Sequence, residues 1–289
     1  MDNRLVVSTY QRLMLLQDGQ QYTLDEGNGP YFGLTWNRWY LFVGVRRWAT
    51  AETEAIQIYN RRLQLVETYE LPGINQLHQI YWRRGLLYLT NTQRDRVMET
   101  DLHGSMSTVY HAEFETALRE GDADRRHING LWCDSDLFYI SELHGAIKVF
   151  TPFWRLMNVF DLPYELHNVY LEGAHLYTCA SDSEAVLRLN LSTDETDLFN
   201  VGGHLGVMQD ANDLHQAYTR GLARTYDRWY IGASAIQNER EDRVRGDSAI
   251  LAFDNNWQFV ESIRLPDTGQ LVDVRVLGCD RAHGGTIWR

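Results

Sequence analysis

The chain has 289 residues, of which 44% are hydrophobic and 12% aromatic, and its formal net charge at pH 7 is −12. This acidic balance argues against nucleic acid or a membrane surface as partner, and no apolar run approaches the roughly 18 residues of a membrane span. The three cysteines are far apart and the N-terminus carries no recognisable targeting segment, so we expect a cytoplasmic protein with free thiols.

Strand-forming segments recur along the chain with a period of about 40 to 50 residues, the spacing typical of propeller blades. Three short segments come first, at 5–9, 13–16 and 21–24. The first complete unit follows with four segments, at 32–36, 39–44, 55–59 and 63–69. Four strands per unit match the four-stranded sheet of one blade.

The four later units each begin at a polar residue, at His78, His127, His167 and Arg220. The C-terminus adds only one clear segment, 271–277, which we expect to join the three N-terminal segments in a shared blade that closes the ring. The predicted fold is therefore all-β, a six-bladed β-propeller of four-stranded blades formed as one domain by residues 1–289.

Two stretches are longer than a plain blade requires. Residues 112–119 have apolar positions at helical spacing, which predicts a short surface helix. Residues 235–246 form a charged loop between the second and third strands of the fifth unit. Such a loop is either a solvated excursion or a lid over a binding site.

The second and third units resemble the NHL-type repeat of six-bladed propellers, on the segments that start at His78 and at His127. Weaker copies cover nearly the whole chain, which therefore resembles the superfamily of NHL proteins, gluconolactonase and paraoxonase-type lactonases, and strictosidine-synthase-like enzymes. This resemblance implies the fold more firmly than any activity. For the lactonase branches, the resemblance implies a central divalent ion held mostly by Glu, Asn and Asp. The matching positions of this chain carry mainly His and Arg.

The innermost strand of each blade lines the axis, and its start lies beside the end of the antiparallel second strand. These two sets of strand ends therefore predict a polar site at one end of the axis. The inner-strand starts contribute His78, His127, Asn129, His167, Asn168, Arg220 and Asp273. The second-strand ends contribute Asn91, Glu142, Asp182 and Ser234.

Each of these residues has a predicted role. The imidazoles of His78, His127 and His167 could hold one divalent ion, Zn, Fe or Ca, with Asp273 or Glu142 as further ligand or catalytic base. Alternatively, each histidine latches its strand to the backbone of a neighbouring blade. The other polar residues are expected to bind ligand: Asn91, Asn129, Asn168, Asp182, Ser234 and Arg220. Arg220 would hold a carboxylate, phosphate or sulfate, or else pair with Asp273.

The known nucleophile, zinc-protease and nucleotide-binding signatures are missing from the sequence, so no motif names a reaction. We therefore predict that an axial pocket binds a small polar or anionic metabolite and supports metal-assisted hydrolysis or elimination. The alternative is a non-catalytic, NHL-like interaction module that binds a protein partner through a propeller face or the loop at 235–246. Between these hypotheses the sequence leaves open whether the protein is an enzyme.

Overall fold

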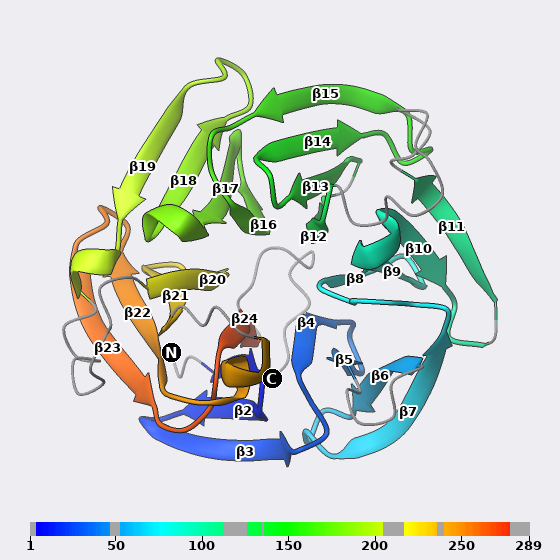
Figure 1. Ribbon diagram of the computed structural model, residues 1–289, viewed down its shortest axis with the longest axis horizontal. Coiled ribbons are helices and arrows are strands. Elements are labelled where there is room, and N and C mark those ends of the chain that lie inside the picture. Colours follow the sequence, from blue (N-terminus) through cyan, green and yellow to red (C-terminus); the bar gives the residue numbers. More distant parts are fainter. Residues whose placement is uncertain are drawn as a thin grey trace.

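The structure, a computed structural model, describes residues 4–46, 53–103, 105–111, 126–134, 136–204, 217–235 and 240–277. Within these ranges the chain forms six four-stranded antiparallel sheets that stand like blades around a central axis (Figure 1). The predicted six-bladed propeller is therefore confirmed. In this part of the chain no helix is long and apolar enough to cross a membrane.

Each blade runs from an inner strand at the axis to an outer strand at the rim. Blade 1 consists of β4 (Tyr31–Trp36), β5 (Leu41–Arg46), β6 (Thr53–Tyr59) and β7 (Leu65–Pro72). Blade 2 consists of β8 (Ile80–Arg83), β9 (Leu86–Asn91), β10 (Arg96–Thr100) and β11 (Met106–His111). Blade 3 consists of β12 (Ile128–Cys133), β13 (Phe138–Glu142), β14 (Ala146–Phe150) and β15 (Leu156–Asp161).

The remaining blades complete the ring. Blade 4 consists of β16 (Leu166–Glu172), β17 (His175–Ala180), β18 (Ala185–Asn190) and β19 (Thr196–Asn200). Blade 5 consists of β20 (Ala217–Arg224), β21 (Arg228–Ala235), β22 (Ser248–Asp254) and β23 (Phe259–Leu265). Blade 6 consists of β24 (Leu271–Leu277), β1 (Arg4–Thr9), β2 (Arg12–Gln17) and β3 (Gln20–Glu26).

Blade 6 is shared between the two ends of the chain, as predicted. Its inner strand β24 comes from the C-terminal side and pairs antiparallel with β1, so that Leu5 lies opposite Val276 and Val7 opposite Val274. Both strands are buried almost throughout. The shared sheet leaves no open edge at the closure, and the last inner strand is held by the first strand of the chain.

Two outer strands were not identified from the sequence. They are β11 and β19. Their sequences show little alternation of apolar and polar residues, because their side chains are half-exposed or exposed along most of their length. A helix predicted at 112–119 lies outside the described residues. Of the loop at 235–246, the described part is a short 3₁₀ helix, η5 (Arg240–Val244).

Bulges at the axial ends of the inner strands bring neighbouring blades close together. Gly33 and Gly221 have φ of 62° and 80°, and Asn168 adopts a similar left-handed conformation. A Cβ atom on Gly221 would lie 2.7 Å from the backbone nitrogen of Val274 in blade 6, so only glycine fits there. The bulges therefore set how closely the inner strands approach one another around the axis.

Candidate functional site: a cationic cluster on the axis

All six blades contribute to a group of interacting polar side chains at one end of the axis. This axial cluster consists of Tyr10, Arg46, His78, His127, His167, Arg220 and Arg243. Tyr10 follows β1, Arg46 ends β5, His78 and His127 precede β8 and β12, and the others lie on β16, β20 and η5. The cluster thus brings together the predicted His and Arg positions.

His78 is held as a neutral imidazole with its proton on Nδ1. That nitrogen lies 2.9 Å from the carbonyl oxygen of Gln76, which can only accept, and 3.3 Å from Nη2 of Arg46, which can only donate. We assign the proton to Nδ1 from the shorter contact. Nδ1 also lies 2.9 Å from Oγ1 of Thr92, whose hydroxyl donates to the carbonyl of Ile128 in the next blade. His78 is therefore linked through one hydroxyl to the neighbouring blade's backbone.

His167 repeats this arrangement two blades further on. The Ser181 hydroxyl donates to the carbonyl oxygen of Thr219 at 2.6 Å, so it must accept from Nδ1 of His167 at 2.9 Å. The lone pair of His167 Nε2 is then free to accept from Nη2 of Arg220, 2.8 Å away. One hydroxyl again joins two blades, and here the imidazole also fixes an arginine.

Both histidines are kept uncharged by their surroundings. Burial lowers the pKa of His78 well below its ordinary value of 6.5, and the charges of Arg46, His127 and Arg220 lower it further. Burial and the Arg220 guanidinium lower the pKa of His167 in the same way. His78 and His167 therefore add no positive charge to the cluster at neutral pH, whereas its arginines do.

Arg46 and Arg220 differ in how their charges are compensated. Arg46 lies 3.4 Å from a carboxylate oxygen of Glu54, donates to the carbonyl of Leu77, and stacks on the ring of Phe32. Arg220 is 5% exposed, and no acidic side chain of the described residues pairs with it. Its Nε has no hydrogen-bond partner within the described chain. Arg220 is thus a buried cation without a counter-charge among these residues.

Tyr10 lies within this positive field. Its ring packs edge-on against Phe32, with 5.6 Å between ring centroids, and its hydroxyl accepts from Nη1 of Arg243 at 3.4 Å. Burial raises the pKa of Tyr10, but the charges of Arg220, Arg46 and Arg243 outweigh that effect and bring it below 10.0. The phenol is therefore a better acid than a free tyrosine.

A second polar group lies on the axis and is anchored by Asp273. Its carboxylate accepts from Nε2 of Gln79 and from the backbone of Leu34, both at 3.1 Å, and from Nε of Arg275 at 3.3 Å. Nδ2 of Asn168 donates from 3.4 Å. Asp273 has no exposed surface and thus ties blades 1, 2, 4 and 6 together. Its predicted role as a catalytic base stays a prediction.

The predicted pairing of Arg220 with Asp273 is not formed, since Asp273 pairs with Arg275. Burial raises the pKa of Asp273, against the opposing effect of the Arg275 charge. The Oδ1 atom of Asn168 accepts from the backbone of Gly221 at 2.6 Å. Asn168 therefore serves as a connector between inner strands in the structure, beside its predicted role in ligand binding.

The other predicted site residues form local contacts in the structure. Glu142 pairs at 3.0 Å with Nζ of Lys148. Asn129 accepts from the Ser141 hydroxyl. Three more hold backbone groups: Asn91 contacts Gly73 and Asn75, Asp182 accepts from Glu165, and Ser234 accepts from Leu271. Their predicted binding or catalytic roles are not tested by these contacts.

The donor set does not fit a metal ion as it is arranged. The basic nitrogen of His167 is occupied by Arg220, and positive charges of Arg46 and Arg220 act on His78. Over the described ranges, no three His, Cys, Asp or Glu side chains lie close enough together to hold a metal. The predicted divalent ion stays a prediction.

Sequence reasoning missed Tyr10, Arg46 and Arg243. The first two follow the rule used for the other blades, because they lie at the ends of the second strands β1 and β5. The rule did not reach them because the expected strands, 5–9 and 39–44, ended before these residues. Arg243 lies in an insertion, and only the structure shows that its carbonyl accepts from the backbone of Gln270 at 2.7 Å.

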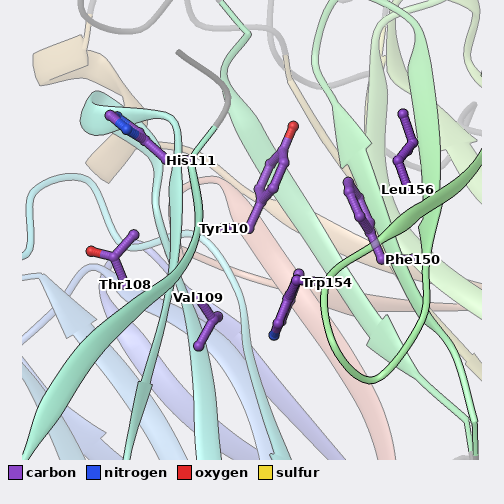
Figure 2. A pocket seen from close by; sticks show the side chains of 7 residues that line it. All are labelled: Thr108, Val109, Tyr110, His111, Phe150, Trp154 and Leu156. Carbon is purple, nitrogen blue, oxygen red and sulfur yellow. The ribbon is translucent and has the colours of Figure 1, made fainter. Parts of the chain in front are cut away.

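A hollow of about 300 Å³ lies away from the axis, between β11 and the β14–β15 turn (Figure 2). Figure 2 shows the rings of Tyr110, Phe150 and Trp154 on its walls. Apolar side chains nearby are strongly exposed, with Phe153 at 93% and Met157 at 60%. This rim of blade 3 is a candidate surface for contact with another molecule.

Comparison with known proteins supports the fold. No family model matches the chain, and neither does any curated protein. A solved protein of unknown function from Bacteroides caccae is similar with a TM-score of 0.65 and 11% identity, covering 96% of this chain and 99% of that one. A structure of a nidogen/laminin complex also gives a TM-score of 0.65, at 10% identity, over 95% and 98% of the two chains.

A third similar structure is virginiamycin B lyase from Staphylococcus aureus, with a TM-score of 0.51 and 10% identity over 84% of this chain and 94% of that one. Likeness at such low identity shows the propeller fold alone. The predicted relation to NHL proteins and lactonases therefore stays a prediction.

Proposed function

We propose that the protein binds a small anionic metabolite at the axial cluster and transforms it by proton transfer through Tyr10. The observation that carries this proposal is Arg220, a buried guanidinium with no acidic partner among the described residues and an Nε without an acceptor. A buried cation is costly unless something compensates its charge. A carboxylate, phosphate or sulfate would supply both the charge and the missing acceptors.

The neighbours of Arg220 support an anion over a cation or a neutral ligand. Arg243 and Arg46 add positive charge, whereas His78 and His167 are held neutral. The described part of the insertion, η5, is fixed beside the cluster because the side chain of Gln11 donates to the carbonyl of Val244. The cluster is therefore a pre-arranged positive site in a chain whose net charge is −12.

Tyr10 is the group best suited to carry a proton in this site. Its pKa lies below 10.0 because three guanidinium groups favour its phenolate. A general base that removes a proton in an elimination, or that activates water in a hydrolysis, needs such a shift. A virginiamycin B lyase shares the fold, which supports an elimination only as far as the fold is compatible with one.

Calorimetric titration tests the binding step. Inorganic phosphate, sulfate, acetate and succinate are titrated into the protein, with glycerol as the neutral control. We expect at least one anion to bind, and Arg220→Met and Arg243→Met each to weaken it by about 10- to 100-fold, the value of about 1.5–3 kcal/mol for a charged hydrogen bond. Arg62→Met, at an exposed turn, is the matched control. Anion binding that is unchanged in a protein carrying both Arg220→Met and Arg243→Met would contradict the proposal.

The second candidate function is the predicted interaction module, and the exposed side chains at the rim of blade 3 favour it. Phe153 and Met157 offer apolar area beside the hollow of Figure 2. Changing both to Ser would remove partner binding by such a module and leave anion binding at the axis unchanged. The two functions can therefore be separated by independent variants.

A further inference from the structure

His167 and Arg220 form a contact whose direction is fixed by chemistry. Arginine can only donate, so Nε2 of His167 accepts the N–H of Arg220 Nη2 over 2.8 Å. The proton on Nδ1 is held in turn by the Ser181 hydroxyl, which donates onward to Thr219. The tautomer of His167 is therefore dictated by a carbonyl of the blade that carries Arg220.

The guanidinium of Arg220 is also held on its flat face. It lies over the ring of Tyr218, with Cζ 4.9 Å from the ring centroid, and the hydroxyl of Tyr218 donates to Glu165 at 3.0 Å. The ring of His167 contacts the same tyrosine edge-on, at 5.2 Å between centroids. One edge and one face of Arg220 are thus fixed, while its Nε has no hydrogen-bond partner within the described residues.

We propose that His167 is the positioning residue of the anion site: in its Nδ1–H tautomer it takes one N–H of Arg220 and so holds the remaining donors ready for the ligand. This inference rests on the proposed anion binding at the same cluster. A free arginine loses much rotamer freedom when it binds, and an arginine already held in place loses less. Preorganisation by His167 should therefore show as tighter anion binding.

Two substitutions separate this role from bulk packing. His167→Gln keeps an oxygen that can accept from Arg220 and an amide that can donate to Ser181. His167→Leu keeps similar volume and removes both functions. With inorganic phosphate as the first anion tested, we expect His167→Leu to weaken binding by about tenfold or more and His167→Gln to restore most of it. His144→Leu, at an exposed turn, is the control for loss of a histidine.

A measurement on the unmodified protein tests the contact without any ligand. Nitrogen-15 NMR of the imidazoles distinguishes the Nδ1–H from the Nε2–H tautomer. We expect His167 to be Nδ1–H, and we expect Arg220→Met to shift its Nε2 signal because the donor is lost. An Nε2–H tautomer, or an Nε2 signal indifferent to Arg220→Met, would overturn the inference even if His167→Leu failed to fold.

The outcomes also keep the two proposals apart. If no anion of the panel binds the wild type, the proposed function fails, whereas the tautomer still decides whether His167 positions Arg220. If phosphate or another anion binds equally well to wild type and folded His167→Leu, anion binding stands and the positioning role of His167 is wrong. Loss of binding in both His167→Leu and His167→Gln would also contradict it, because the glutamine keeps the acceptor.

Discussion

At the scale of single residues, Tyr10 differs from the other tyrosines whose pKa shift is resolved. Burial raises the pKa of Tyr88 to about 12 and also raises that of Tyr31, whereas the three arginines bring that of Tyr10 below 10.0. A lowered folded pKa adds stability that is complete above the unfolded value and is lost as pH falls through the folded one. The folded cluster therefore favours the phenolate form of Tyr10 more than the unfolded chain does.

Absorbance titration of the phenolate can isolate Tyr10 as the difference between the wild type and Tyr10→Phe. We expect this difference to appear below pH 10, and to move to higher pH in Arg243→Met because a positive charge and a donor are lost. Arg62→Met should leave it in place. A Tyr10 that ionises at or above pH 10 would remove the basis for proton transfer at this residue.

The neutral histidines predict how stability responds to acid. Because the folded pKa values of His78 and His167 lie below 6.5, the unfolded chain binds protons first as pH falls. Each histidine then costs about 1.4 kcal/mol of unfolding free energy per pH unit below 6.5, until its folded pKa is reached. Urea unfolding between pH 7 and pH 5 should show this loss, and a double His→Gln variant should lose less. If the free energy of unfolding fell equally with pH in the wild type and in the double variant, the neutral state of the two histidines would be contradicted.

At the scale of elements, the bulges on the inner strands connect the fold with the site. Gly221 follows Arg220 directly, and its backbone lies against β24. The repeats in the sequence predicted the inner strands well, but they could not place the bulges. A bulge changes which side chains face the axis, so alternation along a strand no longer tells them apart. Glu142, at the end of β13, pairs with Lys148 in the structure, and its predicted catalytic role stays a prediction.

Two glycines with the same φ of 80° allow a matched test. A Cβ on Gly73 would meet nothing within 4 Å, whereas one on Gly221 would collide with the backbone of β24. We expect Gly73→Ala to lose about 1 kcal/mol from backbone strain, and Gly221→Ala to lose clearly more and to weaken anion binding as well. Thermal unfolding and phosphate titration measure both effects. Similar losses in the two variants would argue against the close approach.

At the scale of the whole molecule, the sequence predicted the number of blades, the shared closing blade and the end of the axis at which His78, His167 and Arg220 meet. It did not predict which of these residues contact each other. Contacts across the axis join residues more than a hundred positions apart, such as Asn168 and Asp273, and no repeat within one blade encodes them. The ligand itself is therefore inferred from the charge of the assembled ring rather than from a motif.

The Asp273 carboxylate is the test of that assembly. Asp273→Asn removes the charge that faces Arg275 and turns one acceptor into a donor opposite Val274 or Asn168. We expect a loss of about 3–5 kcal/mol in the free energy of unfolding, with partial recovery when Arg275→Met is added. Urea unfolding measures both. A single variant as stable as the wild type would show that the carboxylate does not hold the blades together.

The shared blade has a consequence for the order of events during synthesis. Blades 1 to 5 leave the ribosome before β24. That strand both carries Asp273 and pairs with β1. Until that strand is made, Tyr10 lacks the backbone partner at Gln270 that fixes it beside the arginines. A nascent chain therefore carries exposed blades with no completed axis, and under the proposed function anion binding would begin only once the ring has closed.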